Sequence, residues 1–247
     1  LSQNNEIARG KIVYFVSVSG KTRANIEAAT IIKKLAKKTV AITANPESQM
    51  AKICSEVLPL RFSKEPGLTP GTNSFTASLL ACSRVFGITP TGIDLAEVIE
   101  HAKQWGSKGS KIAGMIHFVS SGCLYPIGMY GAAKIFEFIG EKADYQLTEE
   151  FSHLNLFSMS DDDSVIIIKS SENDSRANKL DEELVNQGYD SQTLEFDKSG
   201  LNVLARAISC SIHLQCLALN VAKSKGLKQP AFLRNDRLLG ISNKMIY

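Results

Sequence analysis

The chain has 247 residues, of which 44% are hydrophobic and 21% are charged. This composition excludes a disordered chain or a fibre and leaves room for one large domain or two small ones. Its net charge of +3 is too balanced for a nucleic-acid-binding surface. No run approaches the roughly 20 apolar residues that cross a bilayer. We therefore expect neither nucleic acid nor a membrane among its partners.

The chain carries no sign of secretion or of a metal site. Its first ten residues are polar and lack the apolar core of a signal peptide, so we expect a cytoplasmic protein. The five cysteines form no CxxC pair, which favours reduced thiols. Cys210, His213 and Cys216 follow helical i, i+3, i+6 spacing, which spreads three side chains around a helix and disfavours a shared metal ion.

Strands and helices alternate, which is typical of an α/β fold with parallel sheets. In the first part we expect strands at 11–16, 40–43 and 57–60, and helices at 22–38, 46–54 and 73–86. The continuous apolar run 11–16 is typical of a strand buried on both faces. The third strand is expected at a sheet edge, because Pro59 cannot donate to an interior ladder.

A polar stretch rich in Gly, Ser and Lys leads to a predicted domain boundary near residue 100. Beyond it we expect strands at 112–120, 165–168 and 192–196, and helices at 126–140, 176–187 and 201–223. The tail, 229–247, is expected to wrap back across the fold. The halves 1–100 and 101–247 are interpreted as two copies of one unit, each a parallel sheet flanked by helices in three αβα layers.

A serine-rich loop, Ser17–Thr22 (SVSGKT), lies between the first predicted strand and helix. Ligands of parallel sheets bind beyond the carboxyl ends of strands, where a helix N-terminus offers free N–H groups to a phosphate. The hydroxyls of Ser17, Ser19 and Thr22 would add donors, and Gly20 would let the backbone approach closely. The loop therefore predicts a phosphate site.

Two other interpretations of this loop exist. Gly-Lys-Thr resembles the end of a Walker A loop, but Phe15 stands where that motif requires glycine, which argues against an NTPase. Ser19 or Thr22 could also serve only as a helix N-cap. The loop by itself leaves the phosphate site and the N-cap equally supported.

At this point several segments resemble a known family. SVSGKTRANIEAA resembles the SxSGxT signature of SIS (sugar isomerase) domains. The segment 118–168 resembles the second SIS repeat of the isomerase domain of glucosamine-6-phosphate synthase and its archaeal relatives. The loop 66–76 and the segment 219–230 resemble that family's threonine-rich segment and its last helix with a Gln-Pro exit. The match runs in order from about Ile12 to Leu233 and implies a double SIS domain.

The resemblance implies catalytic roles in the second half. Tyr130, Lys134 and Glu137 share one helix face, where a surface ion pair is the ordinary interpretation. In the family, the carboxylate matching Glu137 moves a proton between C1 and C2 of an open-chain sugar phosphate, which one base can do through an enediol. Lys134 would orient that base or stabilise the enediolate. His153 matches the histidine of ring opening.

Further contacts and partners follow from the same resemblance. Thr69, Gly71 and Ser121 would contact the sugar, and His153 would reach the site of a neighbouring subunit in a homodimer. No cofactor and no metal are implied. The expected ligand is a phosphorylated sugar or aminosugar.

The chain also departs from the family pattern. No counterpart of the family's first strand precedes Lys11, Val18 replaces a glutamine, and Tyr130 replaces an acidic residue of the catalytic helix. Ala231 and Asn235 stand where an arginine and a lysine are usual. Because that lysine takes part in ring opening in the synthase, these departures argue against the synthase reaction itself.

Three functions fit this sequence. The first is a phosphosugar isomerase, aldose–ketose or aminosugar, that acts through an enediol or enamine. The second is a non-catalytic, regulatory SIS protein that binds a phosphosugar without turnover. The third is a deglycase acting on a sugar-amine phosphate.

Overall fold

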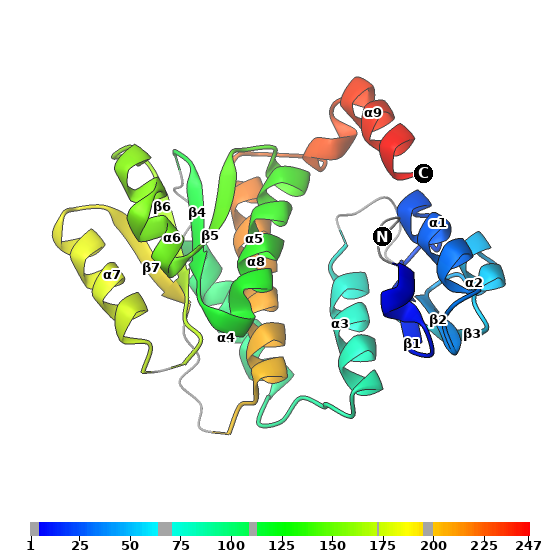
Figure 1. Cartoon of the computed structure of the whole chain (residues 1–247). Helices are drawn as coiled ribbons and strands as arrows, with labels where there is room; N and C mark the ends of the chain where they lie inside the picture. Colours follow the sequence, from blue (N-terminus) through cyan, green and yellow to red (C-terminus); the bar gives the residue numbers. More distant parts are fainter. Residues whose placement is uncertain (1–4, 64–70, 109–112, 172, 195–199) are drawn as a thin grey trace. The chain divides into compact units, whose positions relative to one another are not determined.

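The computed structural model describes residues 5–63, 71–108, 113–171, 173–194 and 200–247 (Figure 1). The chain divides into two compact units, residues 1–88 with 235–247, and residues 89–234. Each unit has its own parallel sheet flanked by helices, which confirms the predicted α/β class. The assignment of SIS repeats to 1–100 and 101–247 stays a prediction.

The first unit contains a three-stranded sheet in the order β1-β2-β3. Its strands are β1 (Ile12–Val16), β2 (Lys38–Thr43) and β3 (Glu56–Pro59), and its helices are α1 (Arg23–Ile32), α2 (Gln49–Ile53), α3 (Asn73–Val85) and α9 (Asp236–Ile246), after a 3-10 turn at Asn5–Ala8. Helices α1 and α2 pack on one face of the sheet, where Phe15 and Ala41 meet Ala29 and Met50. Pro59 lies on an edge strand, as predicted.

Two expectations for this unit are wrong. Strand β1 is not buried on both faces, since Ile12 and Tyr14 are 48% and 38% exposed. The first helix does not continue to residue 38; it ends at Ile32, and Lys38 already belongs to β2. The tail, for which no helix was predicted, contains α9 and belongs to the first unit.

The second unit contains a four-stranded sheet in the order β5-β4-β6-β7. Its strands are β4 (Ile116–Ser120), β5 (Ala143–Leu147), β6 (Ser164–Ile168) and β7 (Asp190–Leu194). Its α-helices are α4 (Leu95–Lys108), α5 (Tyr125–Lys134), α6 (Thr148–His153), α7 (Ser175–Asn186) and α8 (Val203–Ser224). Short turns are η3 (Gly122–Leu124), the π-helical η4 (Ile135–Ile139), η5 (Asn155–Ser158) and η6 (Ala231–Leu233). Strand β5 and helix α6 were not predicted.

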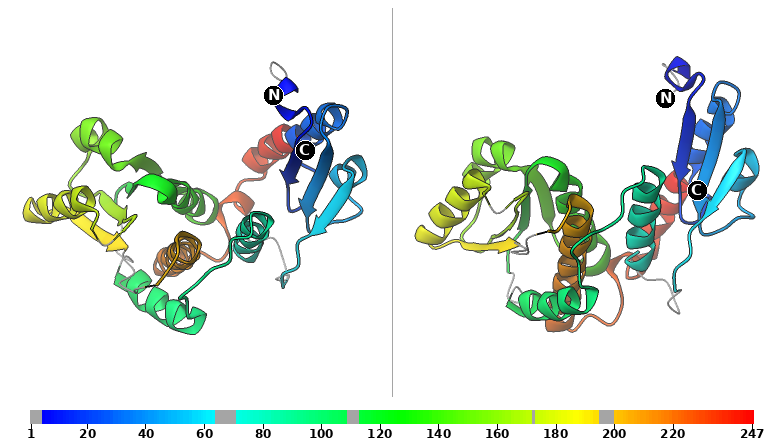
Figure 2. Two further views of the ribbon diagram at one scale, coloured as in Figure 1. Left: turned by 60° about the horizontal axis from the view of Figure 1, so that its bottom comes forward. Right: turned by 90° about the horizontal axis from the view of Figure 1, so that it is seen from below.

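Different helices cover the two faces of this sheet. Val119 and Ile167 face α6 and α7, where they pack against Phe151 and Leu184. Phe118 points the opposite way, because neighbouring residues of a strand alternate, and it lies beside α5 and α8. Helix α4 packs on α8. Figure 2 shows the same layers from other directions, with α7 (yellow) and α8 (orange) on opposite sides of the sheet.

Helix α8 is long and apolar enough to cross a membrane by length and composition alone, contrary to the expectation that no such run exists. In the structure, 61% of its most apolar window is buried inside the fold. Its buried side chains include Leu214 and Leu217, and it packs on α4 and α5. This is the environment of a core helix in a globular domain.

Two adjacent residues of α7 provide a test of this core. Leu184 is 3% exposed and belongs to the core, whereas Val185 is 54% exposed. We expect Leu184→Ala to lower the free energy of unfolding by about 2–5 kcal/mol, because it opens a cavity. Val185→Ala should change it by about 0.5 kcal/mol or less. Urea denaturation measures both values, and equal effects would contradict the packing of α7 described above.

Candidate functional site

The loop that follows β1 holds its hydroxyl groups in a fixed arrangement. The hydroxyls of Ser17 and Thr22 are hydrogen-bonded at 2.9 Å. The Gly20 N–H donates to Ser17 Oγ at 3.1 Å, and the Lys21 N–H donates to Ser19 Oγ at 3.2 Å. Ser17 is buried, and Ser19 and Thr22 are half-buried. The structure thus brings the predicted phosphate-binding residues together in one short loop.

Gly20 anchors this loop against the neighbouring strand connection. Its φ of +64° lies in the left-handed region, and a Cβ there would stand 2.0 Å from Ser48 Oγ. The Gly20 carbonyl accepts from the Met50 N–H at 3.2 Å. Ser48 is itself buried and caps α2 by accepting from the Ala51 N–H. Only glycine fits at position 20.

The N-terminus of α1 directly follows the loop. Thr22 occupies the N-cap position but makes no side-chain capping hydrogen bond, since its hydroxyl is engaged with Ser17. The first-turn N–H groups of a helix have no acceptor within that helix and lie at its positive end. A phosphate placed there would find N–H and O–H donors together. The interpretation of Thr22 as a simple N-cap does not describe this geometry.

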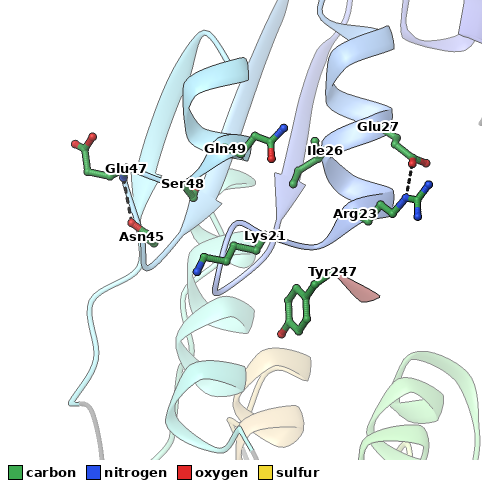
Figure 3. A pocket seen from close by; sticks show the side chains of 9 residues that line it. All are labelled: Lys21, Arg23, Ile26, Glu27, Asn45, Glu47, Ser48, Gln49 and Tyr247. Carbon is green, nitrogen blue, oxygen red and sulfur yellow. Dashed lines mark hydrogen bonds and ion pairs between the residues drawn. The ribbon is translucent and has the colours of Figure 1, made fainter. Parts of the chain in front are cut away.

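A pocket of about 600 Å³ lies beside the loop, in the first unit (Figure 3). Figure 3 shows the Lys21 side chain between the connection that follows β2 and the ring of Tyr247. The remaining lining residues are Arg23, Ile26, Glu27, Asn45, Glu47, Ser48 and Gln49. The hydroxyl-bearing residues of the loop do not line this pocket, so Lys21 is the link between the two features.

Sequence reasoning missed Asn45 and Ser48 at this site. The sequence could have indicated them, because both residues follow the second predicted strand. In a parallel sheet, connections that leave adjacent strands meet at the same edge. Of the predicted sugar-contacting residues in this part of the chain, Gly71 is exposed just before α3. Thr69 lies outside the described residues.

In the second unit, Lys134 and Glu137 form an ion pair. Lys134 Nζ lies 2.5 Å from Glu137 Oε2, with the lysine side chain 7% exposed and the carboxylate side chain 48% exposed. Lys134 ends α5, and Glu137 lies in the π-helical turn η4. π-Helical turns widen a helix locally and are frequent at functional sites. A carboxylate with its charge partner is thus presented partly to solvent.

Tyr130 supports this pair from one turn earlier. The Lys134 ammonium lies 5.2 Å from the centre of the Tyr130 ring, and Gln215 Nε2 donates to the Tyr130 hydroxyl at 2.9 Å. Burial raises the pKa of Tyr130, and the nearby Glu137 carboxylate adds to the rise. Tyr130 is therefore neutral at physiological pH. It cannot replace an acidic residue as a base, but it packs the buried part of Lys134.

A segment near the C-terminus contacts the end of this turn. The Arg234 guanidinium donates to the carbonyl of Ile139, and η6 packs on η4. Gly140 ends the π-helical turn with φ +80°, and a Cβ there would stand 2.8 Å from that of Ala231. Ala231, one of the positions at which the chain departs from the family pattern, thus lies beside the turn that carries Glu137.

Ser121 lies just before η3 and α5, at the end of the helix opposite to Lys134 and Glu137. It follows β4, and its hydroxyl donates to Asp174 Oδ2 at 2.6 Å. Burial alone would raise the pKa of Asp174, but hydrogen bonds from Ser121, the Ala177 N–H and Ser170 outweigh it and lower the pKa. Twelve residues of helix at about 1.5 Å each separate Tyr125 from Glu137 by about 18 Å. The structure does not bring Ser121 and Glu137 together.

His153 also lies apart from Glu137. It ends α6, its side chain is 74% exposed, and its Nε2 lies 3.3 Å from Glu149 Oε1. Helix α6 packs on the sheet face that bears Val119, whereas α5 packs on the face that bears Phe118. Within one chain, the sheet of the second unit therefore stands between the two helices.

The described residues contain no group of three His, Cys, Asp or Glu side chains placed to hold a metal ion. His213 is buried, and its Nε2 lies 2.9 Å from His101 Nδ1 while its Nδ1 hydrogen-bonds the Ser209 carbonyl. Burial lowers the pKa of His213 to about 4. It is a neutral residue of the α4–α8 contact.

Comparison with known proteins now adds a sequence match and several shared folds. Residues 2–86 match the model of the SIS domain. No protein of curated function matches the sequence significantly. Several solved structures of carbohydrate enzymes share the fold at low sequence identity.

A glucosamine-6-phosphate deaminase from Thermotoga maritima is 21% identical with a TM-score of 0.71, covering 89% of this chain and 72% of its own. The tagatose-6-phosphate ketose/aldose isomerase of Escherichia coli is 17% identical with a TM-score of 0.69, over 91% and 72%. The C-terminal domain of glucosamine-fructose-6-phosphate aminotransferase from Francisella tularensis is 19% identical with a TM-score of 0.68, over 87% and 71%. At these identities, the likeness establishes the fold.

Two glycines with similar backbone angles test the role of Gly20. Gly10 has φ +71° with no atom near its missing Cβ, whereas a Cβ on Gly20 would overlap Ser48. We expect Gly10→Ala to cost about 1 kcal/mol of stability, from the positive φ alone. Gly20→Ala should cost more and should also abolish binding of a sugar phosphate. Thermal unfolding and calorimetric titration measure the two effects; equal behaviour of the variants would contradict the anchoring role of Gly20.

Proposed function

We propose that the protein binds a phosphorylated sugar or aminosugar and isomerises it by base-catalysed proton transfer through an enediol or enamine. The observation that carries this proposal is the Ser17–Thr22 loop, whose hydroxyls and following helix N-terminus form a cradle suited to a phosphate. The SIS domain match over the same residues supports it. So do the phosphosugar enzymes among the proteins of similar fold.

In the proposed reaction, the phosphate binds at the hydroxyls of Ser17, Ser19 and Thr22 and at the backbone of Gly20. Glu137 takes a proton from the carbon beside the carbonyl, and the C–H electron pair moves into the enediolate. The same carboxylate returns the proton to the neighbouring carbon. Lys134, 2.5 Å from this carboxylate, orients it and offers positive charge to the enediolate oxygen.

The other predicted residues are proposed to contact the sugar or to act on it. Thr69, Gly71 and Ser121 are proposed to contact its hydroxyls. His153 is proposed to act in ring opening in the site of a second copy, within a homodimer. The two units of each chain are proposed to be two SIS repeats. The separation of α6 and α5 by the sheet supports this sharing, because it keeps His153 away from Glu137 of its own chain.

We also propose a cytoplasmic location without a membrane or nucleic-acid partner. The unpaired state of all five cysteines supports the cytoplasmic location, since a reducing compartment keeps thiols free. Cys54 and Cys210 are buried, and burial raises the pKa of both thiols. Low reactivity of this kind is typical of cysteines with a packing role.

A non-catalytic phosphosugar-binding protein is the second candidate. It is favoured by the half-exposed position of Glu137, because a carboxylate open to water lacks the desolvated environment of many catalytic bases. A deglycase would use the same cradle and base, and its products would distinguish it. The non-catalytic candidate and the isomerase differ in a single measurable step, the exchange of a carbon-bound proton.

Proton NMR in deuterated buffer measures this exchange. With fructose 6-phosphate, glucose 6-phosphate and glucosamine 6-phosphate offered separately, we expect deuterium at C1 or C2 of at least one sugar. Glu137→Gln should slow the exchange roughly 10²–10⁴-fold, since it removes the base but keeps the shape. Binding of the sugar phosphate should be retained.

Glu141→Gln is the matched control. Glu141 lies four residues further on and forms a surface ion pair with Lys225 at 3.1 Å, outside the proposed chemistry. It should leave the exchange rate unchanged. Binding without exchange in the unmodified protein would favour the non-catalytic candidate, and full activity of Glu137→Gln would show that another residue is the base.

A further inference from the structure

A buried histidine outside the proposed site lies between two carboxylates. His117, in β4, is 2% exposed. Its Nδ1 lies 2.9 Å from Oδ1 of Asp144, its partner in the register of β5. Its Nε2 lies 3.5 Å from Oδ2 of Asp163, just before β6, at ion-pair distance but without a hydrogen bond. The imidazole thus links three neighbouring segments of the sheet.

Both carboxylates are fixed by further contacts. Asp163 accepts from the N–H groups of Met115 and Ser160 at 2.7 and 2.8 Å. The second oxygen of Asp144 accepts from the side-chain amide of Asn155. Asn155 begins η5, two residues after His153. A continuous path of contacts therefore runs from His117 through Asp144 to the turn that follows His153.

The remaining neighbours add no competing charge. From α6, the ring of Phe151 meets the imidazole edge-on, with 5.6 Å between ring centres. The two carboxylates of α6 are engaged elsewhere: Glu149 pairs with Arg176 and His153, and Glu150 accepts from the Leu147 N–H. The charged groups in contact with His117, among the described residues, are thus Asp144 and Asp163.

This environment favours the imidazolium form. Burial alone would lower the pKa of His117, but the hydrogen bond and charge of Asp144, together with Asp163, outweigh it and raise the pKa. Burial likewise acts to raise the pKa of Asp163, yet the hydrogen bonds from the Ser160 and Met115 N–H groups, together with the nearby His117, lower it. A neutral His117 that donates to Asp144 would direct its Nε2 lone pair at a carboxylate, which is unfavourable.

We propose that His117 is a positioning residue: as an imidazolium it fixes Asp144 and, through Asn155, the α6–η5 turn that carries His153. The functional meaning of this turn rests on the proposed role of His153. The path of contacts from His117 through Asp144 to Asn155 concerns only the fold of the second unit. Because His117 titrates, this path makes the order of the turn depend on pH.

The sign of this dependence follows from the raised pKa. The stabilisation by charged His117 is complete below the ordinary histidine pKa of about 6.5 and is lost as pH rises through the higher folded value. At the acid end, the lowered pKa of Asp163 means that its contribution is lost only as pH falls through that value. The turn should be most ordered between these limits.

Two measurements without any sugar test the proposal. In the 15N-labelled protein, we expect His117 to titrate above the ordinary histidine value. The protection of the Leu154 and Phe157 amides against hydrogen exchange should fall with the same midpoint. In the turn, the Leu154 N–H donates to the Glu150 backbone carbonyl and the Phe157 N–H to that of Leu154. His117→Gln keeps a donor but no charge, and should remove this pH step.

Asn155→Ala breaks the path without changing the buried core, and covers the case in which His117→Gln fails to fold. It should speed exchange at Leu154 and Phe157 about tenfold at every pH. Asn186→Ala, at the exposed end of α7, is the control and should have no effect. Unchanged exchange in Asn155→Ala, or a pH step unrelated to the His117 titration, would overturn the proposal. Neither result depends on whether the protein isomerises a sugar, so the two proposals fail separately.

Discussion

The close approach of Gly20 to Ser48 is the contact on which the candidate phosphate site depends. The two residues leave adjacent parallel strands, and the absence of a side chain at Gly20 lets the two connections touch. Ser48 caps α2 at the same time, so the position of one helix is tied to the loop that begins another. The hydroxyls of Ser17 and Thr22 are then left to bond each other rather than the helix end. A phosphate would replace that mutual contact with stronger, charge-assisted hydrogen bonds.

In the second unit, the sheet face that a helix covers decides where its candidate site residues lie. Lys134 and Glu137 lie at the far end of α5, away from the strand ends where ligands of parallel sheets commonly bind. His153 lies on a helix of the opposite face. In the proposed site, His153 would therefore come from a second copy of the chain. The α6–η5 turn, which carries His153, is also the turn that the His117 network is proposed to hold in place.

Local patterns in the sequence predicted that the Ser17–Thr22 loop joins a strand to a helix, because strand, glycine, hydroxyls and helix follow one another directly. They also predicted the Lys134–Glu137 pair, since i, i+3 spacing on a helix is sufficient. They failed where tertiary context decides: Asp144 and Gln146 make β5 look polar, yet the strand is paired along its length with β4. Asn45 and Ser48 were missed because their role depends on the neighbouring strand. The His117 network joins residues 115 to 163, and no short motif can show it.

The central claim is that the loop after β1 binds the phosphate of a sugar. The most direct test is a two-dimensional 1H–15N spectrum of the protein titrated with glucose 6-phosphate and, separately, with glucose. The account predicts saturable shifts at the amides of Ser19, Gly20, Lys21 and the first turn of α1 with the phosphorylated sugar, and none there with glucose. Shifts confined to other residues, or equal shifts with both sugars, would contradict it.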